Sequence, residues 1–327
     1  MVTSLLDRPE TVRPEVDRTE AGSFGEELQT LMSGVRLRTT WFGNQKQVSK
    51  DQKIQAAQTF DAESKSISMS KKLLDTNGDA WKALVRIRGE MIDTWQTESL
   101  PYPEPGIRLM KRTAIDSFAE RMTRKRRDLQ DATWILERQY PALREQAVIQ
   151  LGDLYNPRDY PDTISGYFDV TWDYPNLEPP EYLRMASPSQ YRQESERIRN
   201  RFNEAVMLAE QAFFAELHEL VEHLLERLSG SEDGKPKIFR NTAITNLHDF
   251  FERFRNLNVG SSLELDRLVA SAQQVVGNID IQQLRTHEHL RTSVAQNLAV
   301  VRSRLDGLMV DRPRRNLIRS GTASNQP

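Results

Sequence analysis

The stretch GYFDVTWDY, residues 166–174, alternates large apolar side chains with polar ones in a chain whose other long segments have helical spacing. The apolar set occupies every second position: Phe168, Val170, Trp172 and Tyr174. An alternation of period two is typical of a strand that buries one face. The stretch therefore predicts a β-strand in the middle of a mainly helical protein.

A second segment with the same alternation is GVRLRTTWF, residues 34–42. A lone buried strand would leave its main-chain N–H and C=O groups unpaired, which is costly. We therefore predict that 34–42 pairs with 166–174 as a small two-stranded β ribbon, with Arg36 and Arg38 facing the aspartates of the second strand. Such a ribbon has two open edges, to which a strand of a partner could add.

Helical spacing and capping signals dominate the rest of the chain. SKDQ (49–52) has the form of a capping box and predicts a helix that lasts until Asn77-Gly78. Further helices are expected over 79–96, 107–139, 141–154, 187–228, 241–257, 262–276 and 280–308. The helix from Ser187 would be roughly 60 Å long. Its apolar residues Phe202, Phe213 and Leu224 repeat every eleven positions, which predicts a nearly straight packing seam.

These elements predict a mainly α fold: an elongated helical bundle with coiled-coil-like long helices and the small ribbon. Polar, Pro-rich ends predict disordered tails. The predicted division of the chain is a tail at 1–22, a bundle with the ribbon at 23–229, a linker at 230–240, a C-terminal three-helix segment at 241–310 and a second tail at 311–327.

Composition excludes several classes of protein. The 327 residues are 38% hydrophobic, carry a formal net charge of −2 and include no cysteine, so a disulfide framework and a thiolate metal site are excluded. A near-neutral balance gives no global field for nucleic acid. No apolar run is long enough for a membrane span, and the first residues lack the apolar core of a signal peptide. We expect a cytoplasmic protein.

No motif predicts an enzyme. HELVEH (218–223) places its histidines five residues apart, whereas a zinc-binding pair on one helical face is four apart. GSEDGKP (230–236) lacks the spacing and the Ser or Thr of a phosphate-binding loop. No serine–histidine–aspartate set is evident. We therefore predict no catalytic, cofactor-binding or metal-binding residues and no cofactor.

A basic cluster, RMTRKRR at 121–127, is the best candidate for nucleic-acid binding. Its cations are Arg121, Arg124, Lys125, Arg126 and Arg127. Glu120, Asp128 and Asp131 flank the cluster at salt-bridging separations, and no aromatic residue interleaves it. A solvated helix face is the simpler interpretation of this pattern.

The aromatic residues of the two strands have two possible roles. Stripes of this kind usually pack in a core. Alternatively, they form a partner-binding surface, and its candidate residues are Tyr167, Phe168, Val170, Trp172, Tyr174 and Trp41.

Five short motifs occur in a familiar order: GVRLRTTWFGNQKQV, SKKLLD, LYNPRDYP, FDVTWDY and the SP that opens the longest helix. Over roughly residues 30–225 the chain resembles a family of bacterial and phage proteins without assigned biochemistry, often encoded near MoxR- or CobS-like AAA+ ATPases and von Willebrand A-type proteins. The resemblance implies an accessory role as adaptor, regulator or substrate of such an ATPase, and no catalytic residues. Open helical seams would also permit a homo-oligomer.

Overall fold

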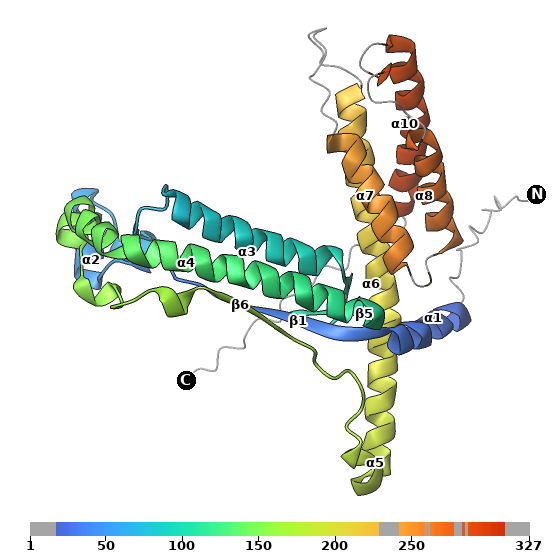
Figure 1. Ribbon diagram of the computed structural model, residues 1–327, viewed down its shortest axis with the longest axis horizontal. Coiled ribbons are helices and arrows are strands. Elements are labelled where there is room, and N and C mark those ends of the chain that lie inside the picture. The colour runs from blue at the N-terminus through green and yellow to red at the C-terminus, as the bar shows by residue number, and fades with distance from the viewer. Residues whose placement is uncertain are drawn as a thin grey trace, which may run out of the picture. The chain divides into compact units, whose positions relative to one another are not determined.

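The computed structural model describes residues 18–228, 242–258, 260, 262–277, 283–284 and 287–310 (Figure 1). The chain divides into two compact units. We call residues 29–198 the sheet unit, and residues 1–28 with 199–327 the helical unit. The structure is mainly helical with a small antiparallel sheet, as predicted.

The sheet has four antiparallel strands in the order β4-β5-β1-β6. They are β1 (Met32–Thr40), β4 (Leu100–Pro101), β5 (Ile107–Lys111) and β6 (Asp169–Asp173). The predicted pairing of the two aromatic segments is confirmed, because β1 pairs with β6 and places Arg36 opposite Asp173. The predicted two-stranded ribbon is wrong, because β5 pairs with the other side of β1 as far as Arg36.

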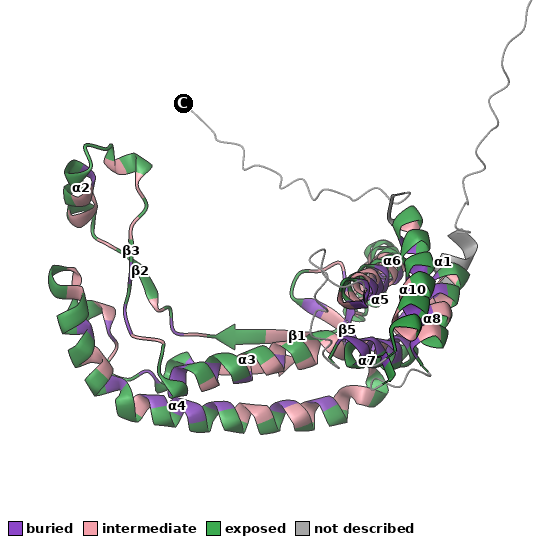
Figure 2. Ribbon diagram, turned by 90° about the horizontal axis from the view of Figure 1, so that it is seen from above, coloured by how far each residue is buried: buried purple, intermediate pink, exposed green. Residues whose placement is uncertain are grey.

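Two long helices pack side by side in the sheet unit: α3 (Asp79–Thr97) and α4 (Ile115–Leu151). The prediction of separate helices at 107–139 and 141–154 was wrong at both ends, because β5 occupies 107–111 and α4 continues through Pro141. A proline inside a helix removes one hydrogen bond and bends the helix. Figure 2 shows this bend toward the C-terminal end of α4.

The helix predicted from the capping box begins as expected but is short. In α2 (Lys50–Thr59) the Ser49 side chain accepts from the Gln52 N–H, and the Gln52 side-chain oxygen accepts from the Ser49 N–H. The helix ends at Thr59, whereas it was expected to reach residue 77. Phe60, which caps the C-terminal end of α2, is 76% exposed. Beyond it, β3 (Ser70–Lys72) pairs with β2 (Gln45–Gln47) as a second, two-stranded sheet.

Short elements complete the sheet unit. They are the 3-10 turns η1 (Ser64–Ser66), η2 (Arg112–Ala114), η3 (Gly152–Leu154), η4 (Pro157–Asp159) and η5 (Ser165–Tyr167), and the one-turn helix α5 (Tyr182–Ala186). The core of this unit lies between α3, α4 and one face of the sheet. It includes Val35, Leu84, Met91, Phe118, Met122 and Val170.

The helical unit contains α7 (Thr242–Leu257), α8 (Leu263–Val276), α10 (Glu288–Val310) and the part of α6 (Pro188–Leu228) from residue 199 onward. Phe213 of α6 stacks edge-on against Phe254 of α7 with ring centroids 5.0 Å apart. The division between the two units falls after residues 28 and 198, and the apolar stripe of α6 packs against α7 within the helical unit.

Both predicted tails and the linker fall largely outside the described residues. Helix α1 (Arg18–Leu31) starts within the predicted tail 1–22, and residues 1–17 are not described. The predicted linker 230–240 and the tail 311–327 also lie outside the described residues.

Gly260 of the helical unit holds a position that other residues fit poorly. Its φ is +72°, and a Cβ there would lie 2.1 Å from a ring carbon of Phe24 on α1. We expect Gly260→Ala to lower the free energy of unfolding by about 2 kcal/mol, because it adds both backbone strain and a clash. Gly307 of α10 is the matched control, since its Cβ would meet nothing within 4 Å. Chemical denaturation of both variants checks this, and equal stability would contradict it.

Candidate interaction surfaces

The six predicted partner-binding residues differ in burial. Phe168 and Val170 are 3% and 0% exposed and belong to the core. The ring of Phe168 meets those of Trp41 and Trp81 edge-on, at centroid distances of 4.9 and 5.7 Å. Within the isolated chain these two side chains stabilise the fold and offer no surface to a partner.

The other four residues are partly accessible. Trp172 packs beside Phe118 with ring centroids 6.4 Å apart, and the guanidinium of Arg88 lies 4.2 Å from the Trp41 ring centre. Tyr167 and Tyr174 are 43% and 38% exposed. Burial of the Tyr174 phenol raises its pKa. The accessible part of the predicted set is thus two tyrosines and two half-buried tryptophans.

The basic cluster on α4 is mostly paired within the sheet unit. Arg121 binds Glu98 with two hydrogen bonds, Lys125 lies 2.9 Å from a Glu90 oxygen, and Arg126 holds Asp169 of β6 through bonds of 2.8 and 2.7 Å. The hydrogen bond from Lys125 lowers the pKa of Glu90, and that from Arg126 lowers the pKa of Asp169. These cations connect α4 to α3 and β6.

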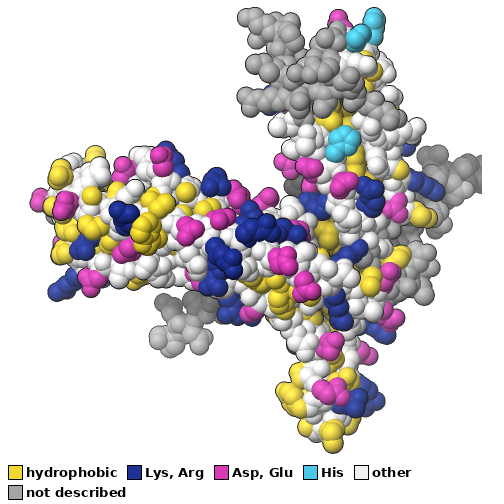
Figure 3. Space-filling view, in the orientation of Figure 1, with side chains coloured by type: hydrophobic (Ala, Val, Ile, Leu, Met, Phe, Trp, Pro, Cys, Tyr) yellow, Lys and Arg dark blue, Asp and Glu magenta, His cyan; other side chains and the backbone are white. Residues whose placement is uncertain are grey.

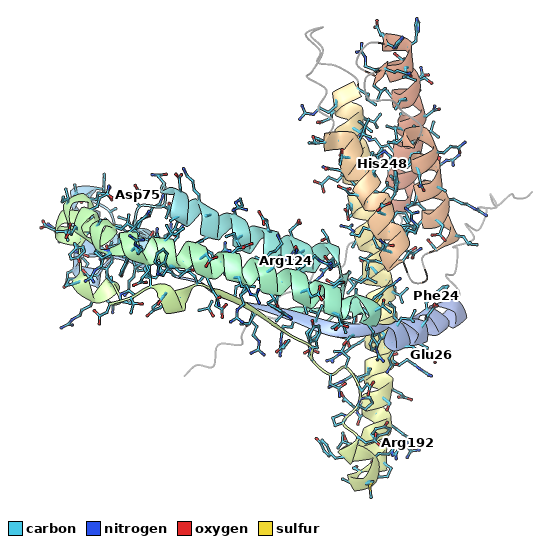
Figure 4. The ribbon with its side chains drawn as sticks, viewed as in Figure 1. Phe24, Glu26, Asp75, Arg124, Arg192 and His248 are labelled. Carbon is cyan, nitrogen blue, oxygen red and sulfur yellow. The ribbon has the colours of Figure 1, made fainter. Side chains whose placement is uncertain are left out.

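Arg124 and Arg127 are exposed, and neither has an ion pair among the described residues. Figure 4 labels Arg124 on α4, and Figure 3 shows basic and acidic side chains intermixed over α3 and α4. Two unpaired arginines could neutralise about two phosphates, which is far fewer than a typical nucleic-acid site neutralises.

A surface that the sequence analysis did not identify lies further along α4. Trp134 is 61% exposed and Ile135 is 47% exposed. The guanidinium of Arg138 lies 4.9 Å from the Trp134 ring centre. A signal for this surface exists in the sequence: both apolar residues fall outside the core stripe of α4, which includes Leu129, Ala132 and Leu136.

A buried ion pair fixes the small β2–β3 sheet. Lys71 Nζ lies 2.7 Å from Asp159, and the two side chains are only 5% and 8% exposed. Lys71 also donates to the Leu154 carbonyl, and Lys46 lies 2.9 Å from Asp159. Burial acts to raise the pKa of Asp159, but hydrogen bonds from Lys46 and Lys71 outweigh it and the pKa is lowered. This arrangement connects β2 and β3 to η4.

The histidines of HELVEH lie in the helical unit. His218 Nε2 is 2.8 Å from Asp306 Oδ1 of α10, which links two helices. No group of three His, Cys, Asp or Glu side chains suited to a metal ion occurs within the described residues. The loop GSEDGKP lies outside them. In the same part of the chain, no helix combines the length and the apolar character needed to span a membrane.

Comparison of the chain with protein-family models, with curated proteins and with solved structures found no match.

Proposed function

We propose that this chain is a non-enzymatic accessory protein that binds a protein partner through the exposed surface of Trp134, Ile135 and Arg138 on α4. The observation that supports the proposal is the exposure of a tryptophan at 61% beside an isoleucine at 47% on one turn of α4. Tryptophan and arginine are the residues that most often supply binding energy at protein interfaces. A protein partner would bury this apolar area.

The partner that we propose is an AAA+ ATPase of a bacterial or phage system, together with or without a von Willebrand A-type protein. The chain would act in the cytoplasm as adaptor, regulator or substrate. This choice of partner is supported by the resemblance of the ordered sequence motifs. We also propose that the long helices α6 and α10 form coiled-coil-like seams within an elongated bundle, since Val294, Leu298, Val301 and Leu305 of α10 are all buried at alternating steps of four and three.

Nucleic-acid binding by the 121–127 cluster is the weaker alternative. Arg121, Lys125 and Arg126 would have to leave their carboxylate partners before they could neutralise phosphates. Such binding would fall steeply with salt.

We expect Trp134→Ser to reduce recovery of the ATPase at least about tenfold when the tagged chain is purified from its native host, because removing one interface hot spot costs about 2 kcal/mol of binding. Quantitative mass spectrometry of the purified material measures this. The folded state should be unaffected, since the side chain is mostly exposed.

Leu263→Ser is the matched control, because Leu263 is 73% exposed on α8 in the helical unit. It should recover the same partner as the native chain. If no ATPase is recovered with the native chain or with Leu263→Ser, the choice of partner is wrong. If the two variants recover it equally, the α4 surface is not the binding site.

A further inference from the structure

Strand β1 is longer than its neighbour β5. It pairs with β5 only from Met32 to Arg36, whereas it pairs with β6 from Arg36 to Thr40. Residues 37–40 therefore have a strand on one side only within the described part of the chain. Arg38, Thr39 and Thr40 are exposed. We call residues 37–40 the β1 edge.

Two observations show which main-chain groups point outward from the β1 edge. Pro101 lies opposite Arg108 and has no N–H, so this is a non-hydrogen-bonded pair and the main-chain groups of Arg108 face β1. Arg108 lies opposite Val35, so Val35 faces β5. Because these groups alternate along a strand, Leu37 and Thr39 face the same way, beyond the end of β5.

The other side of β1 leads to the same result. The Val170 N–H donates to the carboxylate of Asp169 at 2.9 Å, so it does not point toward β1. Val170 lies opposite Thr39 and Trp172 lies opposite Leu37, which makes both pairs non-hydrogen-bonded. The N–H and C=O groups of Leu37 and Thr39 are thus directed to the open edge.

We propose that the β1 edge accepts an extended, acidic strand of a protein partner, which would continue the sheet in line with β5. The proposal rests on the proposed protein-binding function but uses a different surface. Unpaired main-chain donors and acceptors at a sheet edge are complementary to another strand, which gives the affinity, and side chains give the selectivity.

The positive charges at the β1 edge favour an acidic strand as its partner. Arg36 and Arg38 share one carboxylate within ion-pair distance, that of Asp173, and the Arg38 side chain is 61% exposed. A carboxylate opposite Arg38 would form a favourable cross-strand pair. A second copy of this chain is disfavoured, because an antiparallel register that uses both Leu37 and Thr39 places Arg38 opposite Arg38.

The test uses the full-length protein and two synthetic, end-blocked heptapeptides, one of alternating valine and glutamate and one of alternating valine and lysine. Hydrogen exchange followed by NMR reports each amide of β1. We expect the amides of Leu37 and Thr39 to exchange rapidly in the free protein and at least tenfold more slowly with the glutamate peptide. The lysine peptide should leave them unchanged. Slow exchange of both amides in the free protein, or equal protection by the two peptides, would overturn the proposal.

Thr39→Pro is the more selective test, because it removes only the outward N–H of residue 39 and keeps the ladder of hydrogen bonds between β1 and β6. It should abolish protection by the glutamate peptide while Arg38 and Thr40 keep their native exchange rates. If Thr39→Pro loses the hydrogen bonds between β1 and β6, Arg38→Glu is used in its place. Arg38→Glu should bind the lysine peptide in preference to the glutamate peptide. Undiminished binding of the glutamate peptide by the variant that keeps the ladder would overturn the proposal. The purification of Trp134→Ser tests the α4 surface alone, and the peptide experiment tests the β1 edge alone. A failure of the proposed function is therefore distinguishable from a failure of the strand-addition proposal.

Discussion

Replacing Phe168 by alanine is expected to lower the free energy of unfolding of the sheet unit by about 3–5 kcal/mol. The side chain is 3% exposed and lies among the rings of Trp41, Phe42 and Trp81. Its removal leaves a cavity lined by three rings, those of Trp41 and Phe42 from the segment after β1 and that of Trp81 from α3. The loss combines the transfer of a large apolar group with the cost of that cavity.

Denaturant unfolding followed by fluorescence measures this change, because two tryptophans border the cavity. Tyr182→Ala is the control, since Tyr182 is 71% exposed in the same unit and its loss should change stability by less than about 0.5 kcal/mol. Equal stability of the two variants would show that Phe168 is available for a partner, as one interpretation of the sequence held.

The second large effect is expected at Asp159. Asp159→Asn should destabilise the sheet unit by about 3 kcal/mol or more, because Lys71, 5% exposed, would keep a buried charge with no carboxylate beside it. The double variant Asp159→Asn with Lys71→Met should regain most of the loss, since a buried ion pair replaced by apolar groups is often neutral. If the single variant unfolds like the native chain, the pair is not buried in solution.

The same pair predicts a pH dependence. The pKa of Asp159 in the folded protein is lowered below its ordinary value, so at acidic pH the unfolded chain binds more protons at this site than the folded one. The contribution of Asp159 to stability is therefore complete above about pH 5 and is lost as the pH falls below the unfolded pKa of about 3.9. Urea unfolding between pH 3 and pH 6 measures this effect. The free energy of unfolding should depend less on pH in Asp159→Asn than in the control Asp162→Asn, because Asp162 of the native chain is exposed.

Local chemistry determined several elements before any packing is considered. The capping box at Ser49 and the cap at Ser262 start α2 and α8 within one residue of where the sequence predicts helices, because a side-chain oxygen that accepts an N–H is a property of a few adjacent residues. The pairing of β1 with β6 also follows from the sequence. Each segment has an alternating pattern, and their opposite charges meet as Arg36 with Asp173.

Other elements depended on neighbours distant in sequence. The strand β5 has only five residues, IRLMK, and its apolar positions fit the start of a helix equally well until β1 and β4 pair with it. Pro141 would end an isolated helix, yet α4 continues because burial of Tyr140 and Ala147 in the core compensates for one lost hydrogen bond. Ser70–Lys72 became a strand because β2 lies beside it.

For the candidate surfaces too, the sequence indicated some features and the tertiary structure decided the others. Alternation in the sequence indicates that one face of β6 is covered, but only the tertiary structure shows that α3 and α4 cover it and bury Phe168 while Trp134 stays exposed. The cations of the 121–127 cluster are visible in the sequence, but their partners Glu98, Glu90 and Asp169 come from other elements. Periodicity therefore determined which residues could share a face. Contacts between distant segments decided which of those faces meet water, because burial depends on what packs against a side chain.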